Sequence, residues 1–167
     1  VTVSSQKGCP MKCNFCDCPK FGFKGNASLP ELISEITTAI SLSGIKHGKR
    51  LNVHYARMGE PTFNPNVIYS AALIGNMIIT MGLGFDEYHP VVSTMMPKSN
   101  KNLIEFLNNW IQTGFIFGGE EGFGLQFSIN TLNEDDRNEM FRNQSLSLQE
   151  IGNIINELPM PRKRKYD

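Results

Sequence analysis

The stretch "VTVSSQKGCPMKCNFCDCP", residues 1–19, leads from a predicted strand directly into all four cysteines of the chain. Apolar and polar residues alternate over residues 1–6, which is typical of a strand with one buried face. Cys9, Cys13 and Cys16 then follow with the spacing C-x3-C-x2-C, and Cys18 comes two residues later. Thiols therefore occupy the position where a glycine-rich phosphate turn follows the first strand of a dinucleotide-binding domain.

Beyond this stretch, predicted strands and helices alternate along the whole chain. Strands are expected at 50–56, 89–94 and 124–130, and helices at 28–44, 67–81, 100–114 and 145–158. Two of the helices begin with a capping box, in which a serine and the glutamate three residues later satisfy each other's backbone N–H groups. These pairs are Ser28 with Glu31 and Ser147 with Glu150.

Alternating strands and helices indicate parallel βαβ units. We predict an α/β fold that forms part of a (β/α) barrel, with a doubly wound open sheet as the alternative. The chain is expected to be one domain over residues 1–167, truncated so that the last barrel strands are missing, with residues 165–167 beginning a fifth strand. In such barrels the active site is built from the loops that follow the strands.

Composition narrows the class of protein. The chain has 16 basic and 16 acidic residues, so no overall charge attracts it to nucleic acid or to a membrane, although a local basic patch can still bind RNA. The longest uncharged apolar stretch, residues 66–85, is interrupted by polar side chains and is predicted to be a buried helix rather than a membrane span. Cysteines that are clustered without distant partners indicate a metal site in the cytoplasm rather than disulfides.

The spacing of Cys9, Cys13 and Cys16 suits one face of a cubane iron–sulfur cluster, and three ligands leave one iron open for a further molecule. Zinc is the competing metal, but a structural zinc site normally draws on a second pair of ligands at a distance. Cys18 stands too close to Cys16 to share a metal ion with it easily. We therefore predict that Cys18 is not a ligand.

The C-x3-C-x2-C loop after a first strand, with an aromatic residue before its third cysteine, resembles the radical S-adenosylmethionine superfamily. Within it, "SSQKGCPMKCNFCDCPKFGFKGN" is similar to the cluster loop of the adenosine C2- and C8-methyltransferases that act on 23S rRNA and tRNA. The segments "RMGEP", "VVST" and "FSINTLNEDDRNEM" follow in the order of that family's later motifs. The resemblance covers residues 1 to about 142.

The resemblance implies a role for each motif. Cys9, Cys13 and Cys16 would hold a [4Fe-4S] cluster as its metal ligands. Gly59 and Glu60 match the loop that receives the amino group of S-adenosylmethionine, where a carboxylate would suit an ammonium.

Further residues are implied to line the cofactor or the cluster. Ser93 matches a serine near the methionine moiety. Ser128, Ile129 and Asn130 match a triplet that touches the cofactor, and its third position is asparagine here. Phe15, together with Phe21 and Phe23 of the loop's exit, is expected to cover the cluster or the adenine.

The implied activity is reductive cleavage of S-adenosylmethionine to a 5′-deoxyadenosyl radical, used to methylate adenosine in rRNA or tRNA. A one-electron reductant such as flavodoxin or ferredoxin would be a partner, and no membrane is involved. The family also uses two cysteines beyond its cluster, and this chain has neither, because its only spare thiol, Cys18, lies in the cluster loop and matches neither role. Truncation or divergence to other chemistry would explain their absence. The alternatives are a radical S-adenosylmethionine enzyme acting on a peptide or small metabolite, and a non-catalytic iron–sulfur or zinc module.

Competing interpretations remain open for individual residues. Gly118, Gly119 and Glu120 form a second glycine–glutamate segment, but it follows a predicted helix and is expected to be a flexible loop. Ser93 and Ser128 can also be polar caps of strand ends. His54 is predicted to face the barrel interior as a hydrogen-bonded residue. The basic run 162–165 is more consistent with a solvated turn than with a phosphate contact.

Overall fold

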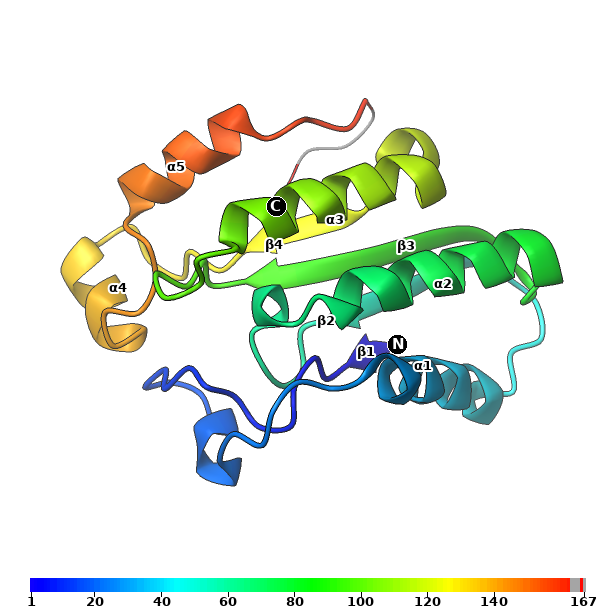
Figure 1. Cartoon of the computed structure of the whole chain (residues 1–167), viewed down its shortest axis with the longest axis horizontal. Helices are drawn as coiled ribbons and strands as arrows, with labels where there is room; N and C mark the ends of the chain where they lie inside the picture. The colour runs from blue at the N-terminus through cyan, green and yellow to red at the C-terminus, as the bar shows by residue number, and fades with distance from the viewer. Residues whose placement is uncertain (163–165, 167) are drawn as a thin grey trace.

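The computed structural model describes residues 1–162 and Tyr166, and a sheet of four parallel strands forms its centre (Figure 1). The strands are β1 (Thr2–Val3), β2 (Gly48–Tyr55), β3 (Phe85–Thr94) and β4 (Gly124–Phe127). Their order in the sheet is β1-β2-β3-β4, so each strand pairs with the next one along the chain. Successive right-handed βαβ units produce this order. The predicted α/β class is confirmed, and the arrangement is consistent with part of a (β/α) barrel.

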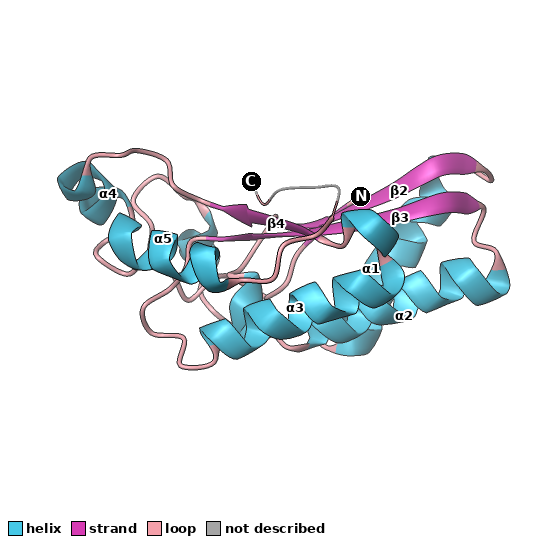
Figure 2. Cartoon of the chain, turned by 90° about the horizontal axis from the view of Figure 1, so that it is seen from above, coloured by secondary structure: helices cyan, strands magenta, loops and turns pink. Residues whose placement is uncertain are grey.

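Helices cover one face of the sheet. Figure 2 shows α1 (Leu29–Ser43), α2 (Asn66–Met81) and α3 (Leu103–Phe117) side by side along this face. The short helix α4 (Glu134–Met140) lies beyond the carboxyl-terminal ends of the strands, and α5 (Leu148–Glu157) follows it (Figure 1). Within the described residues, no helix combines the length and the apolar character needed to cross a membrane.

Both predicted capping boxes are confirmed. The Ser28 side chain accepts the Glu31 N–H while the Glu31 carboxylate accepts the Ser28 N–H, and Ser147 and Glu150 repeat the arrangement at α5. Gly44 ends α1 in the left-handed conformation with φ 68°, which glycine adopts without a steric penalty. These local signals are the reason that the two helices begin where the sequence predicts.

The core lies between the sheet and helices α1 to α3. Val53 and Tyr55 alternate with exposed or half-buried neighbours on β2 and are fully buried. Trp110 of α3 is also fully buried, stacks edge-on against Tyr55 and donates its Nε1–H to the Gly124 carbonyl at 2.9 Å. Burial of each such side chain is worth about 1.5–3 kcal/mol. This packing fixes the strands relative to one another and so fixes the positions of their ends.

The opposite face of the sheet carries small and polar residues. His54 alternates with Val53 and Tyr55, so it points away from the three helices, as predicted. On β3 and β4, Ser93 lies opposite Gln126 in the register, and its hydroxyl donates to Gln126 Oε1 at 2.7 Å. This is the face that a closed barrel would enclose.

The first strand is shorter than predicted. Residues 1–6 were expected to form it, but β1 contains only Thr2 and Val3. The backbone of Ser5 and Gln6 instead bonds to other loops: Ser5 O accepts the Ala27 N–H at 3.1 Å, and the Gln6 N–H donates to Met58 O at 3.2 Å. The chain leaves the sheet early because these bonds hold it against the loop that follows β2.

Other predictions differ from the structure or lie outside the residues that it describes. The strand expected to reach residue 130 ends at Phe127, and helix α4 was not predicted. The segment expected to be a flexible loop contains a 3-10 turn, Gly119–Glu121, whose last residue pairs with Arg50 at 2.9 Å. The expected fifth strand at 165–167 and most of the basic run at 162–165 lie outside the described residues.

Candidate functional site

A cavity of about 180 Å³ opens at the carboxyl-terminal edge of the sheet, between the cysteine loop (residues 7–25) and the loops that follow β2, β3 and β4. Parallel strands direct their carboxyl ends to one edge, so motifs that are far apart in the sequence meet there. Nine of the ten predicted site residues line the cavity: Cys9, Cys13, Phe15, Cys16, Gly59, Glu60, Ser93, Ser128 and Asn130. A larger cavity of about 490 Å³, between α2 and α3, is lined by no cysteine.

The two arms of the cysteine loop lie against each other. The Lys7 N–H donates to Gly25 O at 2.9 Å, and the Lys24 N–H donates to Lys7 O at 2.8 Å. Gly8 lies inside this crossing with φ +81°, and a Cβ at this position would stand 1.5 Å from the Gly22 carbonyl oxygen. Only glycine fits there, so the arms can close and bring the cysteines to the cavity.

Backbone hydrogen bonds fold the cysteines into a tight turn. The Cys16 N–H donates to Cys13 O at 3.2 Å, and the Cys18 N–H donates to Cys16 Sγ at 3.4 Å. Cys18 also lines the cavity, but its own thiol contacts the Arg57 carbonyl at 3.7 Å. Whether Cys18 is a ligand is not decided by these contacts, and its exclusion stays a prediction.

Burial and mutual repulsion disfavour thiolates in the cavity. Burial raises the pKa of Cys13 to about 11, and the neighbouring Cys9 and Cys16 add to the effect. Burial likewise raises the pKa of Cys18 to about 11 and shifts the pKa of Cys9 upward. Thiolates are the form that ligates metal, and a bound cation reverses this balance.

Within residues 1–162 and Tyr166, no three His, Cys, Asp or Glu side chains come together tightly enough to hold a single metal ion. In a cubane each cysteine binds a different iron, so the thiols must surround a volume rather than meet at a point.

Glu60 ties the loop after β2 to the end of β3. Its carboxylate is buried, and Oε1 accepts hydrogen bonds from Thr62 Oγ1 at 2.8 Å and from Thr94 Oγ1 at 2.7 Å. Oε2 accepts the Met95 N–H at 3.1 Å. Burial raises the pKa of Glu60, and these hydrogen bonds oppose the rise. Both carboxylate oxygens of Glu60 already accept hydrogen bonds from other residues of the chain. The predicted contact of Glu60 with a cofactor amino group stays a prediction.

Gln6 holds the Gly59–Glu60 segment from the opposite side. Its Oε1 accepts the Glu60 N–H at 2.9 Å, and its Nε2 donates to Asn26 Oδ1 at 2.7 Å. Gly59 has φ +98°, and a Cβ there would lie 2.6 Å from Gln6 Cβ and 2.8 Å from Ser5 Oγ. Sequence reasoning missed the role of Gln6. The sequence feature that could have indicated this role is the run of polar residues 4–6, which interrupts the alternation of the predicted first strand.

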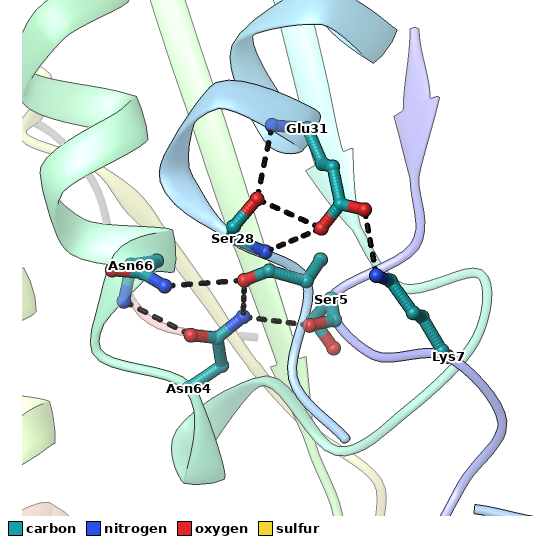
Figure 3. Close-up of polar contacts among 7 residues, drawn as sticks. Ser5, Lys7, Ser28, Glu31, Asn64 and Asn66 are labelled. Carbon is teal, nitrogen blue, oxygen red and sulfur yellow. Dashed lines mark hydrogen bonds and ion pairs between the residues drawn. The ribbon is translucent and has the colours of Figure 1, made fainter. Parts of the chain in front are cut away.

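A second polar network joins this region to the start of α1 (Figure 3). The buried Asn64 donates from Nδ2 to the carbonyls of Ser5 at 2.7 Å and Ala27 at 2.9 Å. Lys7 pairs with Glu31 of the capping box at 2.6 Å. The entry and exit of the cysteine loop are thus both bonded to the segment after β2.

The ends of β3 and β4 supply the remaining predicted residues. Ser93 and Ser128 line the cavity, as the resemblance implies, while the Ser93 hydroxyl also serves its strand neighbour. Asn130 has φ +63°, a conformation that asparagine tolerates better than most residues. Ile129 is the exception among the predicted residues, because its side chain packs against the main core instead of lining the cavity.

The three phenylalanines of the cysteine loop differ. Phe15 lines the cavity and meets Phe141 edge-on, with ring centroids 5.4 Å apart. Phe21 and Phe23 were expected to cover the cluster or the adenine, but they do not line the cavity. Exposure alone does not separate the three rings, because Phe15 is 55% exposed and Phe23 is 49% exposed. The loop exit turns outward through the 3-10 turn Cys18–Phe21, so these two rings leave the site.

The residue that follows helix α4, Phe141, completes the cavity wall, and sequence reasoning did not predict this helix. Phe141, just after the helix, packs with Met11 and Met95 in a small apolar cluster that also contacts Cys9 and Cys13. These apolar side chains limit the access of water to the thiols. A helix of seven residues without an apolar stripe leaves little periodic signal, which explains why the sequence did not reveal it.

No family model matches the chain. Among curated proteins, it is similar to the dual-specificity RNA methyltransferase RlmN of Campylobacter jejuni strain RM1221, with 27% identity over 169 residues that cover 99% of this chain and 43% of that protein. RlmN of Nautilia profundicola is 26% identical over 172 residues, again 99% of this chain and 43% of the relative.

RlmN of Campylobacter fetus is 39% identical over a shorter region of 74 residues, which covers 44% of this chain and 21% of that protein. The chain therefore spans less than half the length of the curated relatives that it matches. The predicted similarity to the RNA adenosine methyltransferases is confirmed for this partial region.

Proposed function

We propose, from the similarity to part of the RlmN RNA methyltransferases, that this chain is the cluster- and cofactor-binding core of a radical S-adenosylmethionine enzyme that methylates adenosine in RNA. The observation that carries the proposal is the cavity itself. Three thiols with C-x3-C-x2-C spacing share its wall with Gly59, Ser93 and Ser128, which come from three different strand ends. A module that only transfers electrons has no need of these additional loops.

In this proposal Cys9, Cys13 and Cys16 hold a [4Fe-4S] cluster. When both groups are bound, the cluster and S-adenosylmethionine supply one-electron cleavage of a carbon–sulfur bond. The protein binds, orients and excludes water. Gly59 and Glu60 would receive the amino group of S-adenosylmethionine, and Ser93 would lie near its methionine part.

The far side of the cavity has a separate role. Ser128 and Asn130 would offer polar contacts to the cofactor from the end of β4, and the chain's Ile129 would support them from the core. Phe15, with Met95 and the loop after α4, would keep water from the reacting bond.

The substrate, the partners and the extent of the domain belong to the same proposal. We infer an rRNA or tRNA substrate, a flavodoxin- or ferredoxin-like reductant, a cytoplasmic location and a single core domain that lacks the last barrel strands. The four cysteines all lie at residues 9–18, so a methyl-carrying cysteine would have to come from outside this sequence. A small metabolite or peptide substrate is the alternative if no such residue exists.

Cluster binding is tested by anaerobic reconstitution of the chain with iron and sulfide. We expect about four irons per chain and loss of iron binding in Cys13→Ala. Cys18→Ala is the matched control, because it removes a thiol from the same loop and is expected to keep the cluster. Tight zinc binding without iron uptake would contradict the proposal, and loss of the cluster in Cys18→Ala would correct the ligand assignment.

Cofactor chemistry is tested with the reconstituted chain, dithionite and S-adenosylmethionine. We expect 5′-deoxyadenosine to form, and Cys13→Ala to abolish it. Incubation with rRNA and tRNA, followed by mass spectrometry of nucleosides, then tests the substrate. Cleavage of the cofactor without any change in RNA, even in the natural full-length protein, would favour the metabolite or peptide alternative.

A further inference from the structure

The cysteine loop is bonded to the end of α4 through one residue, Asn14, which directly follows Cys13. The Asn14 N–H donates to Met140 O at 2.8 Å, and its Nδ2 donates to Glu139 O at 2.7 Å. Its Oδ1 accepts a hydrogen bond from Arg142 Nε at 2.5 Å. One asparagine side chain and its own amide thus make three bonds to a segment more than 120 residues away in the sequence.

Two further contacts lie on either side of Asn14. Phe15 meets the Phe141 ring edge-on at 5.4 Å, and the Cys13 thiol lies 3.8 Å from the sulfur of Met95. Cys13 directly precedes Asn14 and Phe15 in the sequence, and Cys16 directly follows them. The positions of both thiols therefore depend on where the end of α4 lies.

The end of α4 is itself held to the strand ends. Arg137 is fully buried and donates from Nη1 to Leu146 O at 2.8 Å and from Nη2 to Ser145 Oγ at 2.5 Å. Its guanidinium also lies 4.9 Å from the centre of the Phe141 ring. The Ser145 hydroxyl in turn donates to the carbonyl of Met95, just after β3, at 2.5 Å. Arg137 Nε is buried without a hydrogen-bond partner in the described part of the chain, but Nη1 and Nη2 are both bonded, and a shift of the side chain would break these bonds as well.

We propose that Asn14 is a positioning residue, which fixes Cys13 and Cys16 against the arginine-anchored end of α4 and so sets the geometry of the metal ligands. The inference rests on the proposed function for its chemical meaning. The clasp between Asn14 and residues 139–142 is nevertheless testable without any cluster. Asn14 acts through the loop. Removal of its side chain should therefore leave the fold intact and loosen only Cys13 and Cys16.

The test uses the full chain, free of metal, reduced with a phosphine and treated with iodoacetamide. Alkylation of each cysteine is followed by peptide mass spectrometry in the unchanged chain, Asn14→Ala and Lys20→Ala. Lys20 forms an exposed ion pair with Asp17 in the same loop and has no described contact with α4, so it is the matched control. Asn14→Ala removes the two exposed side-chain hydrogen bonds, to Glu139 O and from Arg142, and keeps the backbone bond to Met140 O. Their loss predicts about tenfold faster alkylation of Cys13 and Cys16.

Cys9 is the internal control, because it contacts the same apolar cluster as Cys13 but lies five residues before Asn14, and its thiol is also bonded to the Gly59 backbone in the loop after β2. We expect its rate to be unchanged in Asn14→Ala, and we expect all rates to be unchanged in Lys20→Ala. Unchanged rates at Cys13 and Cys16 in Asn14→Ala would overturn the proposal. Equal acceleration at Cys9 would also overturn it, since that result indicates general loosening of the loop.

A second variant guards against misfolding. Arg142→Ala leaves Asn14 in place and removes one of its three partners, so a smaller acceleration at the same two cysteines is expected. In the double variant the effects should be less than additive, because both changes break the same bond. Full additivity would contradict the clasp.

A spectroscopic measurement on the reconstituted chain connects the clasp to the cluster. We expect the electron paramagnetic resonance g-values of the reduced cluster to shift in Asn14→Ala and to stay constant in Lys20→Ala. If the unchanged chain takes up no cluster, the proposed function fails while the alkylation result still decides the role of Asn14. If the cluster forms and both variants give the native spectrum and native alkylation rates, only the positioning role fails.

Discussion

Gly59 and Gly119 are each followed by a glutamate and both have positive φ, at 98° and 59°, but they lie at opposite ends of the parallel strands. Glu60 is buried in the cavity wall and accepts hydrogen bonds from Thr62 of its own loop and from Thr94 at the end of β3. Gly119 begins a 3-10 turn that precedes β4. The last residue of this turn, Glu121, forms an ion pair with Arg50 near the start of β2. The same short motif is therefore a structural centre at one edge of the sheet and a surface turn at the other.

The difference teaches that the location of such a motif decides its role. At the carboxyl-terminal edge, loops from four strands converge and leave no space beside Gly59. At the other edge, a Cβ added to Gly119 would meet nothing within 4 Å. Paired substitutions at the two positions should therefore differ strongly in effect.

Replacement of the two carboxylates should give the largest contrast. Glu60→Ala leaves the hydroxyl of Thr94 and the N–H of Met95 without their acceptor, which should lower the free energy of unfolding by about 4 kcal/mol. Glu121→Ala breaks only a part-exposed ion pair and should cost about 0.5 kcal/mol. Urea denaturation of both variants measures the difference. Similar losses would show that Glu60 does not hold the loops together.

The two glycines come next. Gly59→Ala should lower the free energy of unfolding by about 3 kcal/mol, because the new methyl group would overlap Gln6 and the backbone is left-handed. Gly119 also has a left-handed backbone, but an added methyl group would overlap nothing there. Gly119→Ala should therefore lower the free energy of unfolding by about 1 kcal/mol. Thermal denaturation followed by circular dichroism distinguishes them. Equal costs would mean that backbone conformation alone accounts for both.

The pH dependence of stability separates buried from exposed carboxylates. Burial raises the pKa of Glu60 above its ordinary value of 4.5, so the stability that this group contributes is present below that value and is lost as the pH rises through the raised pKa. For Glu31 the hydrogen bond with Lys7 and the capping box lower the pKa to about 2, so its contribution is lost as the pH falls.

Urea denaturation from about pH 3 to pH 7 tests this contrast. The stability difference between the native chain and Glu60→Gln should shrink as the pH rises, and the difference from Glu31→Gln should grow. A constant difference for Glu60→Gln would show that Glu60 titrates alike in the folded and unfolded chain.

The smallest expected effect concerns Asn130, whose left-handed backbone is at the cavity edge. Asn130→Gly should leave the free energy of unfolding almost unchanged, while Asn130→Ala should lower it by about 1 kcal/mol, because alanine is disfavoured at φ +63°. If the side-chain amide contacts the cofactor, both variants should weaken S-adenosylmethionine binding equally, as measured by equilibrium dialysis. Weaker binding in Asn130→Ala alone would assign the role to the backbone.

Much of the fold was predictable because its signals are local. The capping boxes at Ser28 and Ser147 were read correctly from residues three positions apart. The order of strands and helices followed from periodicity. The gathering of Cys13, Glu60 and Ser128 at one cavity also followed, since the ends of parallel strands must meet.

Other features were missed or misplaced because they depend on distant contacts. Phe21 and Phe23 were expected at the site, but the turn at Cys18–Phe21 carries them into solvent. The strand expected to reach residue 130 ends at Phe127, and the Ile129 side chain packs against the main core instead of lining the cavity, so its predicted contact with the cofactor stays a prediction. Neither a turn direction nor an early strand end has a clear sequence signal.

The sequence by itself determined the α/β class, the helix starts and the metal-type cysteine spacing, because each depends on residues within one or two turns of chain. Only the tertiary structure decided that Glu60 is a buried link between loops, that Gln6 holds it, and that Asn14 bonds to the end of α4. These contacts join residues 34 to 125 positions apart. Such pairs come together only when the packed core fixes the strand ends, so no local pattern can specify them.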